Sequence, residues 1–82
     1  MASVFGPVFL SDLRALTKEQ RGRVAVVVRE IENDPKPDGV RKREAPPPFK
    51  PGMLVAVSRG FAVRYSIEPA GLRFYRVQLL QR

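Results

Sequence analysis

GMLVAVSRGFAVRYSIEPAGLRFYRVQLLQR, residues 52–82, decides the fold because it predicts three consecutive strands, at 53–58, 61–67 and 72–80. Only Arg59-Gly60 separates the first two strands, and four residues that end in Gly71 separate the last two. Short connections that contain glycine are typical of antiparallel strands joined as hairpins. In the middle strand large apolar residues alternate with small or polar ones, and Arg64 belongs to the second set. We therefore expect a sheet with one apolar face and one face that carries Arg64.

The last predicted strand changes phase along its length. Leu72 and Phe74 fall on one side, whereas Tyr75, Val77 and Leu79 fall on the other. Two arrangements explain such a change: a β-bulge near Phe74, or partial burial of both faces of the sheet at this strand. If the second set faces the core, the residues that share the open side with Arg64 are Arg76, Gln78, Leu80 and Arg82.

The first half of the chain has to cover the apolar face. Residues 4–10 predict a first strand, with Pro7 at an edge or a bulge because it cannot donate to a ladder. Ser11-Asp12 is a plausible N-cap for a short helix. Residues 17–20 have the T-x-x-Q form of a capping box, so a second helix is predicted to begin near residue 18.

One apolar stripe marks this second helix, since Val24, Val27, Val28 and Ile31 recur at helical spacing. Asn33-Asp34-Pro35 follows and predicts its end. A rival interpretation is a buried strand over residues 24–28, which are rich in β-branched side chains. The cap, the stripe and the proline favour the helix.

Residues 40–45 predict a short basic strand that contains Arg41, Lys42 and Arg43. The proline-rich residues 45–52 that follow predict a stiff, extended loop, with Phe49 plugging the edge of the core. The predicted fold class is α+β, with a two-helix hairpin packed on one face of a mainly antiparallel four-stranded sheet in the order β-α-α-β-β-β. Residues 1–82 are predicted to form a single domain.

Composition narrows the function classes. The 82 residues include no cysteine and no histidine, which excludes disulfides and removes the commonest general base and metal ligand. We expect no metal, no cofactor, no signal peptide and no membrane span, and we expect a cytoplasmic location.

The net charge of +7 lies entirely in residues 40–82, which hold nine basic and two acidic residues. A field of one sign favours a polyanion or an acidic protein as partner, although like charge also keeps an ordinary surface soluble.

Several segments resemble the RelE/ParE superfamily of toxins from bacterial type II toxin–antitoxin pairs. Residues 39–42, GVRK, are similar to the family's Gly-x-(Lys/Arg)-Lys segment. Residues 58–65, SRGFAVRY, resemble its Arg-x-Gly-Tyr-Arg hairpin, and residues 77–82, VQLLQR, resemble its last strand and terminal arginine. The resemblance implies a toxin that either cuts mRNA on the ribosome, as in the RelE-like branch, or inhibits DNA gyrase, as in the ParE-like branch. It also implies a cognate antitoxin as partner. The implied assembly is a hetero-oligomer with this antitoxin or a homodimer.

The hairpin departs from the catalytic branch at three positions. Ala62 stands where that branch carries an arginine, and Met53 and Val55 stand where it carries lysines. The branch's aromatic residue beyond the last arginine has no counterpart in the printed sequence. The resemblance implies a catalytic role for Arg82, and Arg64 lies one strand step of about 6.6 Å from Ala62 on the same face, where it could replace the missing arginine. The candidate phosphate-binding residues are Arg41, Lys42, Arg43 and Arg76.

RNA cleavage by a 2′-hydroxyl also needs a base. Without histidine the candidate bases are a lysine, Glu44, Glu68, Tyr65 and Tyr75. Phe61 or Phe74 could stack on a nucleotide base, although Phe61 and Tyr65 lie on the apolar face, which favours a place in the core for both. Three functions remain open: a ribosome-dependent endoribonuclease, a non-catalytic toxin that inhibits gyrase or only binds its antitoxin, and a small basic RNA-binding domain.

Overall fold

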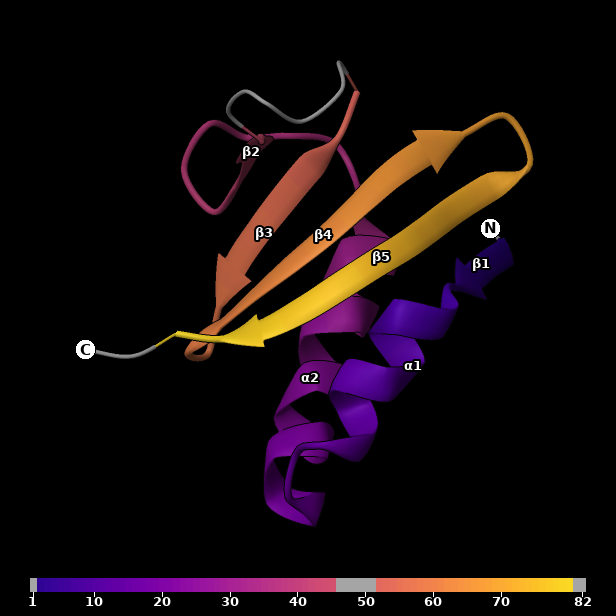
Figure 1. The fold of residues 1–82 in the computed structure, drawn as a ribbon. Coiled ribbons are helices and arrows are strands. Elements are labelled where there is room, and N and C mark those ends of the chain that lie inside the picture. Colours follow the sequence, from indigo (N-terminus) through magenta and orange to yellow (C-terminus); the bar gives the residue numbers. More distant parts are fainter. Residues whose placement is uncertain (1, 46–51, 81–82) are drawn as a thin grey trace.

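The computed structural model describes residues 2–45 and 52–80, and in it two helices pack on one face of a five-stranded sheet (Figure 1). The elements are β1 (Ala2–Phe5), α1 (Pro7–Arg14), α2 (Lys18–Asn33), β2 (Lys42–Glu44), β3 (Leu54–Ser58), β4 (Phe61–Glu68) and β5 (Gly71–Leu79). The predicted α+β class is confirmed, but the sheet has five strands rather than four, because the predicted basic strand forms at Lys42–Glu44 and pairs with β3. Within the described residues, neither helix has the length and apolar character needed to cross a membrane.

Helix α1 corrects the prediction for the N-terminal segment. A strand over residues 4–10 is wrong beyond Phe5, since Gly6 is the N-cap and Pro7 opens the helix. Proline suits the first helical position because its fixed φ is already helical and no amide is needed there. The predicted N-cap at Ser11-Asp12 is wrong as well, because both residues lie inside α1.

Helix α2 follows the sequence prediction closely. The Thr17 hydroxyl accepts from the Gln20 amide at 3.1 Å and the Gln20 side chain accepts from the Thr17 amide at 2.9 Å, which completes the predicted capping box. The predicted stripe faces the sheet and is buried; its members are Val24, Val27, Val28 and Ile31. The rival strand over residues 24–28 is therefore wrong.

Strand order across the sheet is β1-β5-β4-β3-β2, with β1 parallel to β5 and every other pair antiparallel. The predicted meander is the centre of this sheet. Gly71 has a φ of 147° where β1 begins beside β5, and a Cβ there would lie 2.0 Å from the Ala2 carbonyl oxygen. A residue without a side chain is therefore required for the two strands to approach.

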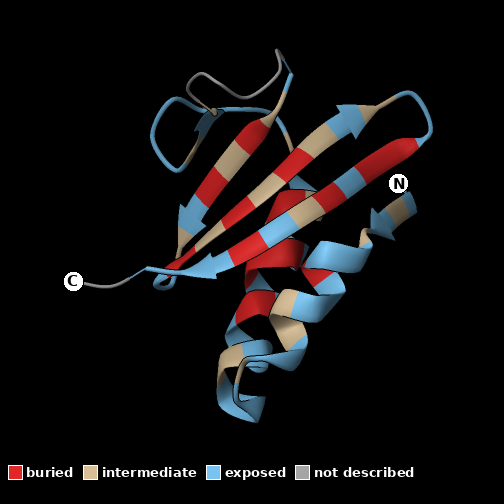
Figure 2. Ribbon diagram, in the orientation of Figure 1, coloured by how far each residue is buried: buried red, intermediate tan, exposed pale blue. Residues whose placement is uncertain are grey.

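The core lies between the helices and one face of the sheet, as the buried segments in Figure 2 show. Its largest side chains are aromatic, and Phe74 lies within 5.7 Å of the Phe9 ring and 6.1 Å of the Tyr65 ring, measured between ring centroids. Phe61 is fully buried, as its alternation with Arg64 predicts, so its core interpretation is confirmed; Phe74 is buried as well, and neither can stack on a base. Phe49 lies outside the described residues.

The phase change in β5 is a β-bulge, as predicted. Arg64 pairs with Arg76, while the next residue, Tyr65, pairs with Phe74. Tyr75 is the extra residue. Phe74 before it and Val77 after it both face the core, so Tyr75 and Arg76 both point to the opposite side.

Candidate phosphate-binding face of the sheet

The side of strands β2–β5 that the helices do not cover carries most of the charged residues of the sheet; we call it the open face. Its positions alternate with the buried ones along each strand. The open face consists of Arg43, Val55, Val57, Ala62, Arg64, Ser66, Glu68, Arg73, Tyr75, Arg76 and Gln78. Every one of these residues is at least partly exposed.

One row of this face crosses four strands and holds three arginines. Arg43 pairs with Val55, Val55 pairs with Arg64, and Arg64 pairs with Arg76. Strands lie about 4.8 Å apart, so the row spans about 14 Å. Like charges placed directly opposite each other destabilise a strand pair, and the Asp12 carboxylate offsets part of this repulsion by pairing with Arg76. The row is a candidate site for a phosphate.

Helix α1 holds the outer end of this row. Beyond Phe74 strand β5 has no β1 neighbour, and the carboxylate of Asp12 covers this free edge. It accepts from the Val77 amide at 3.1 Å and from the Arg76 Nε at 3.3 Å. The Arg76 side chain remains 45% exposed. Asp12 thereby orients Arg76 without withdrawing it from solvent.

A cluster of four polar side chains lies one step along the strands from the arginine row. Ser66 pairs with Arg73, and the Ser66 and Tyr75 hydroxyls are 2.9 Å apart. The Glu68 carboxylate accepts from Ser66 at 3.4 Å and from Tyr75 at 3.5 Å through one oxygen, and from Arg73 Nε at 3.2 Å through the other. The bulge is what brings Tyr75 to this side.

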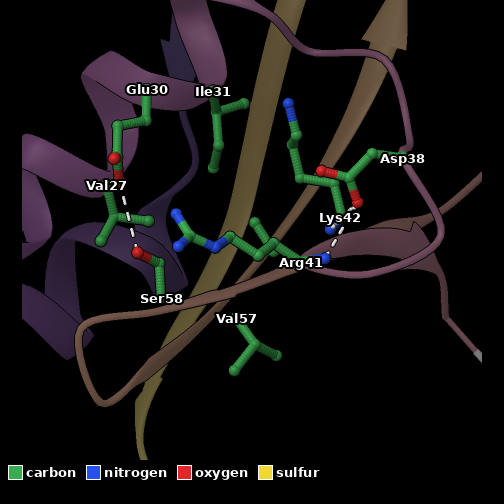
Figure 3. Close-up of a pocket in the computed structure, with 9 residues that line it drawn as sticks. Val27, Glu30, Ile31, Asp38, Arg41, Lys42, Val57 and Ser58 are labelled. Atoms are coloured by element: carbon green, nitrogen blue, oxygen red, sulfur yellow. Dashed lines mark hydrogen bonds between the residues drawn. The ribbon is translucent and has the colours of Figure 1, made fainter.

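Two of the predicted phosphate ligands lie away from the open face. Arg41 and Lys42 line a cavity of about 180 Å³ between α2 and β3, shown in Figure 3. Lys42 is only 14% exposed and contacts Asp34, 3.7 Å from its carboxylate. Asp38 organises this turn by accepting from the amides of residues 40–42, and these bonds, led by that of Lys42, lower the pKa of Asp38. Arg82 lies outside the described residues.

Two of the candidate bases are also placed away from the open face. Tyr65 is fully buried and its hydroxyl donates to the Pro35 carbonyl at 2.7 Å. Burial, followed by the charges of nearby carboxylates, raises the pKa of Tyr65 to about 12, which makes it a poor base. Glu44 pairs with the buried Leu54, so it occupies the helix-side phase of β2. Glu68 and Tyr75 remain as bases on the open face.

Sequence reasoning identified the three arginines of the row but gave Arg73, which lies outside the row, no role. It named Glu68 and Tyr75 only as two bases among several. The signal that could have joined them to Ser66 is the predicted bulge, because one extra residue near Phe74 moves Tyr75 to the side of Arg64 and Ser66.

Solved structures share this fold. A chain of the toxin–antitoxin complex RelBE2 from Mycobacterium tuberculosis aligns with a TM-score of 0.78 at 15% identity, covering 95% of both chains. The isolated RelE toxin of E. coli aligns with a TM-score of 0.74 at 15% identity, covering 98% of this chain and 84% of that one. The RelB–RelE complex of Methanococcus jannaschii gives 0.66 at 14% identity, covering 93% and 88%. Neither a protein-family model nor a curated relative matches this sequence. The chain has the fold of the RelE toxins, as its motifs predicted.

Proposed function

We propose that this protein is the toxin of a type II toxin–antitoxin pair and that its open face binds and cuts mRNA on the ribosome. The observation that carries the proposal is the row of three arginines on the uncovered face of a RelE-like sheet. Two of the structural neighbours are complexes of a toxin with its antitoxin, which supports a cognate antitoxin as the partner that restrains this chain. Its site of action would be the cytoplasm, where ribosomes translate mRNA.

The chemistry of the row suits a phosphodiester. Guanidinium groups bind phosphate oxygens in pairs, and cations around the scissile phosphate stabilise the charge that develops during cleavage. Arg64 and Arg76 lie on adjacent strands, about 4.8 Å apart at their backbones, so both can contact one phosphate. Arg43 lies two strands further, about 10 Å from Arg64, within reach of a neighbouring phosphate.

A second candidate function is favoured by the apolar positions of the same face. Val55 lies within the row and Ala62 lies one strand step from Arg64, at positions where the resemblance to the catalytic branch implies a lysine and an arginine. A toxin without those cations would act by binding alone, either on DNA gyrase or on its antitoxin. The two candidates share the fold and differ in whether RNA is cut.

Induced expression in bacteria separates the candidates. Under the first, growth stops, transcripts are cut within their reading frames, and Arg64→Gln with Arg76→Gln abolishes the cuts. The control Arg21→Gln with Arg23→Gln removes the same charge from the exposed surface of α2 and leaves the cuts unchanged. Growth arrest with intact transcripts and blocked supercoiling by purified gyrase would support the second candidate and refute the first.

A further inference from the structure

Resting on the proposed cleavage of RNA, we propose that Glu68 is the general base that removes the proton from the attacking 2′-hydroxyl. Ser66, Arg73 and Tyr75 are positioning residues that hold its carboxylate beside the arginine row. Neither the positions shared with the toxin motifs nor the arginine row itself includes these four residues.

The first observation is the direction of the Glu68 side chain. Glu68 lies two residues beyond Ser66 on β4, yet one of its carboxylate oxygens is 3.4 Å from the Ser66 hydroxyl. The side chain therefore leans back along the strand toward Arg64, whose backbone is one step of about 6.6 Å from that of Ser66. A phosphate held by Arg64 would bring its neighbouring ribose next to this carboxylate.

The second observation is that Glu68 is the accessible carboxylate of the sheet beside the row, whereas Asp12 comes from α1 and is engaged by Arg76 and the Val77 amide. Among the described residues of β2–β5, Glu68 is the one carboxylate on the open face, because Glu44 occupies the helix-side phase. The Glu68 side chain is 38% exposed, so its carboxylate can contact a substrate while it accepts hydrogen bonds from its neighbours. A base must combine such access with a fixed orientation.

The third observation is how the carboxylate is fixed. Arg73 contacts one oxygen at 3.2 Å, while Ser66 and Tyr75 approach the other. Tyr75 reaches it only because the bulge adds a residue to β5. Bulges commonly redirect a side chain next to an active site. The ion pair between Glu68 and Arg73 lies at the surface, where solvent screens it, so it contributes little to the stability of the fold.

The proposed step is balanced as follows. The 2′-hydroxyl transfers its proton to the Glu68 carboxylate, and the freed electron pair on the 2′-oxygen forms a bond to phosphorus. The bond from phosphorus to the 5′-oxygen breaks, and that oxygen leaves with the electron pair and takes a proton from solvent water. The products are a 2′,3′-cyclic phosphate and a 5′-hydroxyl end, and Glu68 returns its proton to solvent.

The test compares Glu68→Gln with Glu44→Gln in the full chain, using ribosomes programmed with a defined mRNA. Both substitutions remove one carboxylate from an exposed strand position, and both variants are expected to keep the wild-type melting temperature. Glu68→Gln is expected to lower kcat by about 10²–10⁴-fold with little change in KM, and to remove the acidic limb of the pH profile. Glu44→Gln is expected to cleave like the wild type. Tyr75→Phe, which keeps the carboxylate, is expected to lower kcat and retain the acidic limb.

The outcomes separate the two proposals. If the wild type cuts mRNA and Glu68→Gln cuts it at the same rate, or if Glu44→Gln is impaired equally, Glu68 is not the base although the proposed function stands. If the wild type cuts neither ribosome-bound nor free mRNA, both proposals fail together. Cleavage of an mRNA whose target nucleotide lacks the 2′-hydroxyl would overturn the proposed step by itself.

Discussion

Removal of the three row arginines should change how RNA binding depends on salt. Each phosphate of a single strand that a protein neutralises contributes about −0.7 to the slope of log K against log salt. If Arg43, Arg64 and Arg76 each neutralise about one phosphate, the row contributes a slope of about −2. Between about 50 and 200 mM salt, a slope of −2 corresponds to a loss of affinity of about 16-fold. The triple change to glutamine should remove this share of the salt dependence.

Fluorescence anisotropy of a labelled single-stranded RNA, titrated at several salt concentrations, measures the slope directly. The matched control replaces Arg14, Arg21 and Arg23, three exposed arginines of the helices, with glutamine. Both triple variants carry the same net charge, so a non-specific effect of charge would change the two slopes equally. The reasoning is refuted if the helix variant loses as much slope as the sheet variant, or if the sheet variant keeps the wild-type slope.

Two further predictions concern the framework that supports the open face. Tyr65→Phe removes the hydrogen bond to the Pro35 carbonyl, so the free energy of unfolding should fall by about 1 kcal/mol. Burial raises the pKa of Tyr65 to about 12, so the contribution of the protonated Tyr65 to the free energy of unfolding is complete below pH 10 and is lost as the pH rises toward 12. Denaturant unfolding at a series of pH values should show this loss in the wild type and not in Tyr65→Phe. Gly71→Ala places a Cβ 2.0 Å from the Ala2 carbonyl oxygen, so the free energy of unfolding should fall by about 1–3 kcal/mol and the melting temperature should fall with it. A Cβ at Gly22 meets nothing within 4 Å, so Gly22→Ala should raise the free energy of unfolding by up to about 1 kcal/mol. Equal effects of the two alanines would contradict the glycine argument.

Local signals in the sequence predicted most of the fold. The capping box, the apolar stripe and the terminal proline of α2 all act within a few residues of one another, so they were readable without knowledge of the tertiary structure. The bulge was readable too, since a change of phase within one strand has few causes. Pro7 misled the prediction because proline suits a strand edge and a helix start equally well, and only packing distinguishes the two.

The candidate site depended more on register than on residue type. Arg64 and Arg76 are 12 positions apart in the sequence, and their pairing follows from the bulge together with the hairpin. Arg43 lies in the same row because it pairs with Val55. Its sequence neighbours Arg41 and Lys42 carry the same charge but line the cavity between α2 and β3. A run of like charges in a sequence does not show which of its members share a face.

A titration of isotope-labelled protein with a short single-stranded RNA, followed by amide and guanidinium NMR signals, tests the central claim most directly. If RNA binds the open face, we expect the largest shifts at Arg43, Arg64, Ser66 and Arg76. The signals of α1 and α2, apart from those near Asp12, are expected to remain unchanged. Shifts confined to the helices, with the four open-face residues unchanged, would contradict the claim that this side of the sheet is where the protein meets RNA.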